Sequence, residues 1–298
     1  MKSNRPIPRV AAINDLSGFG RCSLTVAIPV LSAMGIQVCP LPTVILSNHT
    51  GYSHFTFDDY TDRMESYIEN WKQLQLEFDA LYSGFFANAE QISKIAEFIS
   101  FYRKSKPLVL VDPVMADNGK MYATCTNELL QQMQKLVSMA TVATPNVTEA
   151  CLLTGTDYGE WEQAENKIER CYCMAKQLVN AGCKQVVITG VRTDDQNILN
   201  IVYDGENEPT YSATQLVPAG FSGTGDVFAS VLCGCLIKGL SLYDAVKTSA
   251  RFLYQVTKET YQSRLPTLDG ITFEPFLGEL CNIIVNPCTR KENQNEKL

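Results

Sequence analysis

The run Leu108-Val109-Leu110-Val111, followed at once by Asp112, decides the fold of this chain. Four consecutive apolar residues without polar alternation are typical of a strand buried on both faces, as in the middle of a parallel sheet. Similar apolar runs occur on either side of it, at residues 80–82, 142–143 and 186–188. The sequence therefore predicts a central, mostly parallel sheet.

Helical patterns separate the apolar runs along the whole chain. Apolar residues recur at spacings of three and four between Tyr60 and Leu74, which marks an amphipathic helix. A first strand at residues 9–13 is expected to lead into a glycine-containing loop at residues 15–20. Further helices are predicted at residues 21–34 (ended by Gly35), 92–102 and 223–262 (interrupted at Gly239).

Two extended segments depart from the buried-strand pattern. Residues 36–46 contain Pro40 and Pro42, which confine such a strand to a sheet edge or a bulge. Residues 198–211 hold two strand-like runs around Asp204-Gly205, a hairpin signal. Together the patterns predict an α/β fold with helices on both faces of the sheet. We expect one domain over residues 1–298, a small edge excursion at residues 37–57 and a frayed tail at residues 289–298.

Composition excludes several classes of protein. The 298 residues are 45% hydrophobic, and 25 Lys+Arg against 32 Asp+Glu give a net charge of −7, which speaks against a nucleic-acid partner. The charge-free stretch at residues 22–57 is broken by prolines and polar residues, which speaks against a membrane span. Eleven cysteines without a C-x-x-C pair, two histidines and no signal-peptide pattern favour reduced thiols in a cytoplasmic protein.

Polar and acidic residues follow the predicted strands. In an open parallel sheet, ligands collect beyond the carboxyl ends of the strands. The loops at that edge contain Asn14, Asp15, Asp112, Asp117, Asn146, Glu149 and Thr189. Each loop alone has ordinary turn composition. Because all of them fall at the same edge, the sequence predicts a binding site there.

Residues 221–230, FSGTGDVFAS, carry the most specific chemical signal. Gly223, Thr224 and Gly225 begin a predicted helix with side chains too small to block its first N–H groups, which makes an anion site. Asp226 in the first turn either favours the helix dipole or accepts a proton from an attacking hydroxyl.

Competing motifs are absent from the sequence. It contains no G-x-x-x-x-G-K-[ST] loop and no G-x-S-x-G elbow, which counts against P-loop NTPases and α/β-hydrolases. Gly18 and Gly20 follow the first strand, but no third glycine stands at Ser23. The dinucleotide-binding fingerprint is therefore incomplete, and a dehydrogenase is a distant alternative.

Four motifs, in register, resemble those of a known family. Residues 223–226 are similar to the G-T-G-D signature of ribokinase-like small-molecule kinases. Residues 47–52, SNHTGY, resemble the motif that marks pyridoxal/pyridoxamine kinases within that superfamily. Residues 112–115 and 144–149 are similar to the two central motifs of the family, in the same order. The likeness spans about residues 9–265.

This resemblance implies a ribokinase-like fold and ATP-dependent phosphorylation of the 5′-hydroxymethyl group of pyridoxal, pyridoxamine or pyridoxine. It implies that Asp226 is the base and that Gly223, Thr224 and Gly225 form the anion hole. It places Asp112, Asn146, Thr189 and Thr224 at ATP, and Asp112, Asp117 and Glu149 near Mg²⁺. It assigns Asp15, His49, Thr50, Phe85 and Tyr122 to the substrate side. It further implies a cytoplasmic homodimer and leaves a need for K⁺ open, with Lys120 and Arg192 as candidate phosphate contacts by loop position.

Two residues depart from the family pattern, and two other functions stay open. Asp15 replaces a serine that is usual after the first strand, and Phe85 replaces a frequent tyrosine. A carboxylate at residue 15 would favour a cationic group such as the amine of pyridoxamine. The alternatives are a hydroxymethylpyrimidine kinase, against which the motif at His49-Thr50 speaks, and a non-catalytic vitamer- or nucleotide-binding protein, against which Asp226 speaks.

Overall fold

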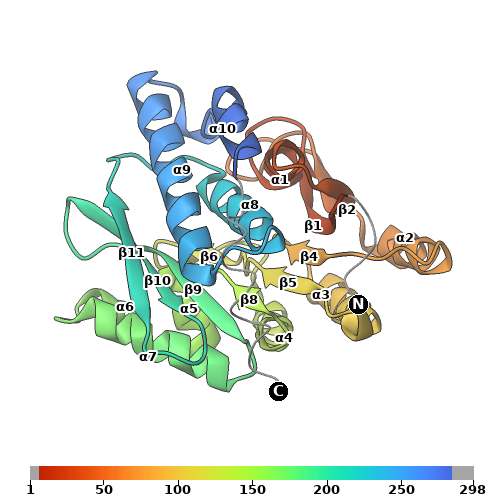
Figure 1. Cartoon of the computed structure of the whole chain (residues 1–298), viewed down its shortest axis with the longest axis horizontal. Helices are drawn as coiled ribbons and strands as arrows, with labels where there is room; N and C mark the ends of the chain where they lie inside the picture. Colours follow the sequence, from red (N-terminus) through yellow and green to blue (C-terminus); the bar gives the residue numbers. More distant parts are fainter. Residues whose placement is uncertain (1–6, 284–298) are drawn as a thin grey trace, which may run out of the picture.

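The computed structural model describes residues 7–283, which form one large sheet and one small sheet. The strands are β1 (Arg9–Ser17), β2 (Gln37–Leu46), β3 (Phe57–Asp59), β4 (Ala80–Ser83), β5 (Leu108–Val111), β6 (Ala116–Asp117), β7 (Lys120–Met121), β8 (Val142–Ala143), β9 (Gln185–Val191), β10 (Asn197–Tyr203) and β11 (Thr210–Gln215). The large sheet has the order β11-β10-β9-β8-β5-β4-β1-β2-β3 (Figure 1). Strands β2 to β9 along this order run parallel, whereas β3, β10 and β11 are antiparallel additions at the two ends.

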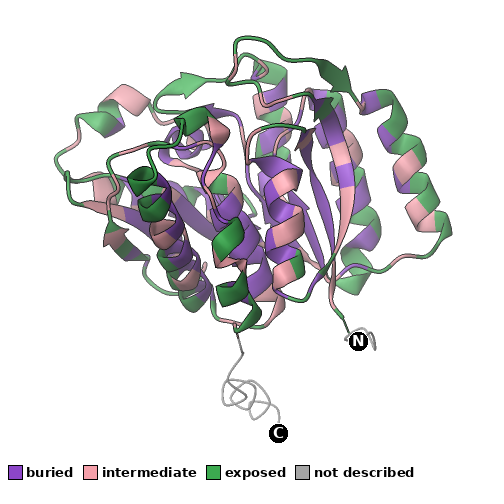
Figure 2. Cartoon of the chain, turned by 90° about the horizontal axis from the view of Figure 1, so that it is seen from above, coloured by how far each residue is buried: buried purple, intermediate pink, exposed green. Residues whose placement is uncertain are grey.

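Helices cover both faces of the sheet, as the alternating pattern predicts. They are α1 (Ser23–Ala33), α2 (Thr61–Gln73), α3 (Ala89–Tyr102), α4 (Asn127–Ser138), α5 (Val147–Thr154), α6 (Tyr158–Glu162), α7 (Lys167–Asn180), α8 (Thr224–Ile237), α9 (Leu242–Gln262) and α10 (Leu277–Cys281). One core packs α1, α8, α9 and α10 on one face, and a second core packs α2 to α5 and α7 on the other. In Figure 2 the strands are buried between helices whose outward faces are exposed. None of the helices within residues 7–283 is both long and apolar enough to cross a membrane.

The first strand is longer than the sequence indicates. We predicted a loop from residue 15, but β1 continues to Ser17, because Leu16 and Ser17 still pair with Ile45 and Leu46 of β2. The register of this pair shifts between Asn14 and Leu16, so Asp15 lies at an irregularity in the strand. This part of the loop prediction is wrong. Asp15 is therefore a buried residue of β1 near the carboxyl end of the strand.

Other local predictions are confirmed. Pro40 and Pro42 lie in a stretch of β2 that pairs with β1 only, since β3 joins β2 from Val44 onward. The missing proline N–H groups therefore cost no ladder bond. Strands β10 and β11 form the predicted antiparallel hairpin. Gly239, with a φ of 92°, separates α8 from α9. The predicted tail at residues 289–298 lies outside the described residues.

Candidate active site

Helix α8 begins at the carboxyl edge of the sheet with an N-terminus that no side chain caps. Its N-cap residue Gly223 has φ 79° and ψ 4°, and a Cβ atom there would lie 1.9 Å from the carbonyl oxygen of Arg21, so only glycine fits. The first intrahelical bond runs from the N–H of Val227 to Gly223, at 2.9 Å. A Cβ atom at Gly225 would meet nothing within 4 Å. The end of α8 is therefore open and has positive dipole character, which suits an anion.

Asp226 is the third residue of this open helix end, and its carboxylate is held by two neighbouring segments. The amide nitrogen of Asn14 donates to Oδ1 of Asp226 at 3.3 Å, and the backbone N–H of Ser23 donates to the same carboxylate. Burial and, to a smaller extent, the nearby charge of Asp15 raise the pKa of Asp226 from 3.8 to about 6, against the lowering effect of these hydrogen bonds. A carboxyl group with this pKa is ionised at neutral pH and basic enough to take a proton from an alcohol in a transition state.

Asp15 is a buried neighbour of this site, and both of its carboxylate oxygens are already hydrogen-bonded within the protein. Its two carboxylate oxygens accept hydrogen bonds from the hydroxyls of Ser17, at 2.7 Å, and Ser23, at 2.5 Å. Burial raises its pKa. Ser23 has a φ of 52°, in the left-handed region, and it contacts Asp15 through its hydroxyl and Asp226 through its backbone. A non-glycine residue in this conformation at the junction of two carboxylates is a typical site of stored backbone strain.

Two further carboxylates lie buried at the same edge. Asp112, directly after β5, accepts a hydrogen bond from the hydroxyl of Thr144 at 2.9 Å. Burial and the charge of Asp226 raise the pKa of Asp112 to about 7. Burial and the charge of Asp112 also raise the pKa of Glu149 well above its ordinary value. The charge of Asp226 thus raises the proton affinity of Asp112, and the charge of Asp112 raises that of Glu149, in a region of low dielectric constant.

Asn146 and Glu149 form the reciprocal cap of α5. Oδ1 of Asn146 accepts from the N–H of Glu149 at 3.0 Å, and Oε2 of Glu149 accepts from the N–H of Asn146 at 2.8 Å. The Asn146 amide nitrogen donates to the carbonyl of Ala116 at 2.7 Å. Thr189 of β9 lies beside Asn146 in a parallel bridge, and its N–H donates to Pro145. Two of the residues assigned to ATP, Asn146 and Thr189, are therefore brought together, but both side chains of the cap also have a structural role.

The β6–β7 hairpin carries Asp117 and leads to Tyr122. Asp117 is exposed, and its carboxylate accepts from the backbone and side chain of Asn118 at 2.9 Å each. Although part of its surface is exposed, desolvation by the surrounding protein is the main cause that raises the pKa of Asp117, and the hydrogen bond from Asn118 and the positive charge of Arg192 oppose it. Tyr122 is partly exposed, but desolvation of its hydroxyl and the charges of four of the site carboxylates, Asp117, Glu149, Asp226 and Asp112, raise the pKa of that hydroxyl. Tyr122 is thus placed near the acidic group.

The chemistry of these carboxylates fits a hard divalent cation that ATP brings with it. Mg²⁺ takes oxygen ligands and keeps several waters, so nearby carboxylates can act through those waters. Within residues 7–283, none of Asp112, Glu149 and Asp226 forms an ion pair. In the same part of the chain, no three His, Cys, Asp or Glu side chains are placed so that they could hold a metal by themselves. Carboxylate oxygens of this kind fit Mg²⁺ when phosphate oxygens and water complete its ligands.

His49 closes one side of the site by binding the protein itself. Its Nδ1 accepts the N–H of Gly51 at 3.1 Å, so Nε2 is the protonated nitrogen and donates to the carbonyl of Leu268 at 2.7 Å. The hydroxyl of Tyr52 donates to Asp269 at 2.8 Å. Both contacts fasten residues 47–52 to the 3₁₀ turn η2 (Thr267–Asp269). The predicted substrate residue His49 therefore has both ring nitrogens engaged.

The other predicted substrate residues lie at the rim. Thr50 is exposed, next to His49 in the same loop. Phe85 is half-buried just after β4, and its backbone is fixed on both sides. Its N–H donates to Oδ1 of Asn14 at 2.7 Å, and its carbonyl accepts from the hydroxyl of Thr43 at 2.9 Å. The structure thus places Phe85 beside the residue that contacts Asp226.

Three residues of this site have no role assigned from the sequence. Asn14 is expected only at the binding edge, Tyr52 belongs to the SNHTGY motif without a stated contact, and nothing in the sequence marks Ser23 as a neighbour of the site. A surface hollow of about 360 Å³ lies elsewhere, where the turn after β10 meets the start of α9, and it is lined by residues such as Asp204, Glu208 and Ser241. It contains none of the predicted site residues, so the chemistry points to the end of α8 instead.

Comparison with known proteins agrees with this geometry. The phosphomethylpyrimidine kinase family model matches residues 30–266. The chain is 31% identical over 265 residues to the pyridoxine/pyridoxal/pyridoxamine kinase of Bordetella avium, covering 85% of this chain and 86% of that protein. A Bacteroides thetaiotaomicron protein, described as a candidate phosphomethylpyrimidine kinase and crystallised with pyridoxal, is 37% identical with a TM-score of 0.87, covering 92% and 96% of the two chains. The pyridoxal kinase of Lactobacillus plantarum is 30% identical with a TM-score of 0.81, with the same coverage.

The nine-stranded sheet, the open helix end and its carboxylates define a small-molecule kinase with a ribokinase-like fold. The chain belongs to the phosphomethylpyrimidine kinase family, and it is similar to proteins named as pyridoxal kinases over most of its length. The fold class, the enzyme class and the family likeness predicted from the four motifs are confirmed. The domain boundaries and the roles of single residues stay predictions.

Proposed function

We propose that this protein transfers the γ-phosphoryl group of ATP to the 5′-hydroxymethyl group of a B6 vitamer. One observation carries the proposal: the carboxylate of Asp226 lies in the first turn of a helix whose N–H groups no side chain caps. A phosphoryl group and an acceptor alcohol can meet there. The likeness to the B. avium kinase and to the B. thetaiotaomicron structure with pyridoxal supports the choice of acceptor.

In this proposal the residues at the start of α8 divide the work. Gly223, Thr224 and Gly225 leave N–H groups directed at the charge that develops on the migrating phosphoryl group. Asp226 accepts the proton of the attacking hydroxyl, so that the new O–P bond forms as the bond to the leaving ADP oxygen breaks. Positioning and charge neutralisation supply most of the rate enhancement in such transfers.

The buried carboxylates give ATP and its metal a place. Mg²⁺ would neutralise phosphate charge, and Asp112 and Glu149 would hold it, directly or through water, with the rim residue Asp117 farther out. Asn146 and Thr189 adjoin this group from the neighbouring strand end. We also keep the homodimer, the cytoplasmic location and a role for K⁺ as proposals.

On the vitamer side, we propose contacts from Phe85, Thr50 and Tyr122, with His49 holding its loop in place. The predicted effect of Asp15 on amine-bearing vitamers takes a different form, because both of its oxygens already accept serine hydroxyls. Asp15 would act through its negative charge and not through a direct hydrogen bond. Replacing it by serine and comparing pyridoxamine with pyridoxal tests this, and an unchanged ranking of the two would contradict it.

An ADP-release assay with Mg²⁺-ATP and a panel of acceptors tests the function itself. We expect turnover of pyridoxal, pyridoxamine or pyridoxine with kcat/KM at least tenfold above that of hydroxymethylpyrimidine. The family model keeps the second substrate as the main alternative, and a preference for it would contradict the proposal. Tight vitamer binding without turnover would instead support a non-catalytic binding protein.

A further inference from the structure

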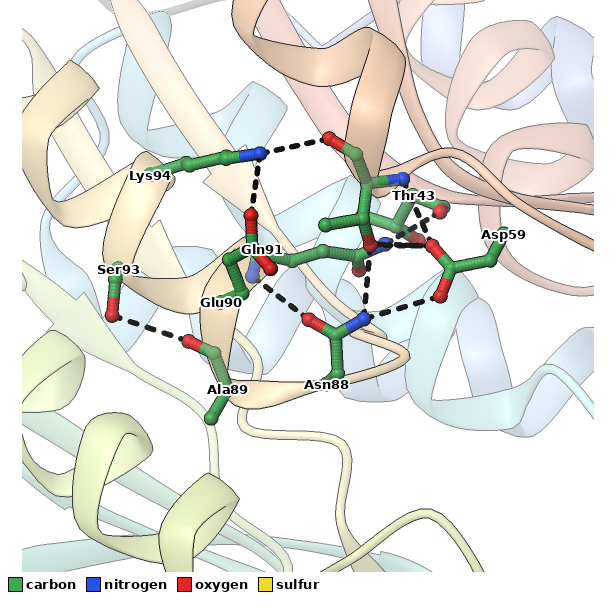
Figure 3. Close-up of polar contacts among 9 residues, drawn as sticks. Thr43, Asp59, Asn88, Ala89, Glu90, Gln91, Ser93 and Lys94 are labelled. Carbon is green, nitrogen blue, oxygen red and sulfur yellow. Dashed lines mark hydrogen bonds and ion pairs between the residues drawn. The ribbon is translucent and has the colours of Figure 1, made fainter.

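A polar network at the start of α3, buried at Gln91 and exposed at Asp59, joins β2, β3 and α3 (Figure 3). Gln91 is fully buried. Its amide nitrogen lies 2.8 Å from the carbonyl oxygen of Thr43 in β2 and 3.1 Å from the carboxylate of Asp59 in β3. Its amide oxygen accepts the N–H of Ala87 at 2.9 Å. A glutamine removed from water must satisfy both ends of its amide, and this one does so by connecting β2, β3 and α3.

Asp59 is the point at which this network holds the edge excursion. The amide nitrogen of Asn88 donates to Asp59 at 3.1 Å, and the backbone N–H of Thr61 donates to it at 2.8 Å. Residues 47–59, which we name the covering segment, thus end on a fixed carboxylate. Their other end carries His49 and Tyr52, which bind the turn η2. The covering segment is tied down at both ends.

The same network continues to the candidate base through hydrogen bonds that are linked by the covalent framework of Thr43 and Phe85. The hydroxyl of Thr43 donates to the carbonyl of Phe85 at 2.9 Å, and the N–H of Phe85 donates to Asn14 at 2.7 Å. Asn14 then donates to Asp226 at 3.3 Å. Asn14 rests directly on the backbone before Phe85, because a Cβ atom at Gly84 would lie 2.4 Å from its amide nitrogen. These close contacts leave little room for the covering segment to move independently of the Asp226 carboxylate.

We propose that Gln91 and Asn14 are positioning residues of one hydrogen-bonded relay that couples the covering segment to Asp226. The relay runs through Asp59, Gln91, Thr43, the backbone N–H and carbonyl of Phe85, and Asn14 to Asp226. Its catalytic consequence rests on the proposed function. When a vitamer binds under the covering segment, the relay also fixes the orientation of the Asp226 carboxylate. A displacement at either end reaches the other, and small misplacements of a reacting group cost about 10- to 100-fold in rate.

Two substitutions break the relay at opposite ends. Gln91→Met keeps the side-chain volume and removes both polar atoms. Asn14→Asp keeps the oxygen that accepts from Phe85 but replaces the donor to Asp226 with an acceptor. We expect Gln91→Met to raise the vitamer KM and to lower kcat, each about tenfold, and Asn14→Asp to lower kcat at least tenfold. The KM for ATP should stay within about twofold in both. Ser241→Ala, which removes the cap of α9 far from the relay, is the control for lost stability.

Amide hydrogen exchange tests the coupling without reference to catalysis. We expect Gln91→Met to speed exchange in residues 47–59 and in residues 84–88, and Ser241→Ala to leave both unchanged. If the native protein phosphorylates no vitamer, the proposed function fails, while this exchange pattern still supports the coupling. Unchanged exchange in the covering segment of Gln91→Met would overturn the relay. So would kinetics in which both relay variants match Ser241→Ala.

Discussion

Helices α8 and α9 follow each other in the chain and carry an aspartate at the same position of the first turn, yet the two carboxylates have different roles. In α9, Ser241 accepts the N–H of Asp244 at 3.1 Å and donates its hydroxyl to that carboxylate at 2.7 Å. In α8, Gly223 offers no side chain, and Asp226 instead faces Asn14 from β1. In α9, the side chain of Ser241 therefore binds both a free N–H group of the helix N-terminus and the carboxylate of Asp244.

This difference shows what separates a structural helix end from a candidate catalytic one. Both aspartates favour the helix dipole. Only Asp226 lies beside open N–H groups and other buried acids, and burial raises its pKa to about 6. The presence of an aspartate at this position of a helix is therefore not sufficient to make it a candidate catalytic residue. The residue at the N-cap and the segments facing the first turn decide the role.

Substitution of Asp226 should separate the two helix ends by the largest effect on activity. We expect Asp226→Asn to lower kcat about 10²–10⁴-fold, or about 3–5 kcal/mol of barrier, because the variant cannot accept the alcohol proton. The matched change Asp244→Asn should leave kcat within about twofold. Steady-state kinetics with Mg²⁺-ATP and pyridoxal measure both. Near-native turnover in Asp226→Asn would remove this residue from the role of base.

Substitution of the N-cap residue Gly223 tests whether the open N-terminus of α8 matters for catalysis. Gly223→Ala forces a Cβ atom against the Arg21 carbonyl in a left-handed conformation, so the N–H groups of α8 must move. Loss of one such donor costs about 10²–10³-fold in kcat in other enzymes, and we expect a loss of about this size. Gly239→Ala carries a similar φ of 92° with nothing within 4 Å of the added Cβ. It should cost some stability but little kcat, and equal losses of kcat would contradict the proposed anion hole.

The buried charge of Asp226 should also lower stability. Because its pKa rises from 3.8 to about 6 on folding, the ionised form is disfavoured in the folded state, and this cost is fully present above pH 6. Asp226→Asn cannot ionise and should be more stable than the native protein by about 1–3 kcal/mol at pH 8. The gain should shrink as the pH falls to 5. Urea unfolding at the two pH values measures it, and a variant that is less stable at pH 8 would contradict the assignment.

The smallest effect belongs to the structural helix end. Ser241→Ala removes the side-chain cap of α9 and should lower the free energy of unfolding by about 1 kcal/mol, the usual value of such a cap. Because the cap lies outside the site, kcat should not change. Thermal unfolding and the kinase assay on the same sample test this. A marked loss of activity would show that the two helix ends are not independent.

Much of the fold followed from local patterns. Apolar runs marked the buried strands, and Gly239 marked the break between α8 and α9. Pro40 and Pro42 marked the part of β2 without an outer partner. The open start of α8 was visible because glycine and threonine side chains are short. These features depend on neighbours in the sequence, which periodicity and turn chemistry report.

The rest depends on contacts between distant residues. The extension of β1 through Asp15 needs the pairing partner in β2, and His49 finds its acceptor 219 residues away at Leu268. No local pattern could indicate that Asn14 contacts Asp226, 212 residues apart. The predicted site residues were thus gathered at the right edge, but the hydrogen bonds that hold them were not predictable.

The pH dependence of kcat, measured in the native protein and in Asp226→Asn, tests whether Asp226 is the base. If Asp226 is the base, kcat with Mg²⁺-ATP and pyridoxal should fall as the pH drops through about 6, because protonation of the carboxylate removes the proton acceptor. The low activity of Asp226→Asn should lack this acidic limb. A limb of the same midpoint in the variant would show that another group titrates, and the account of Asp226 would be wrong.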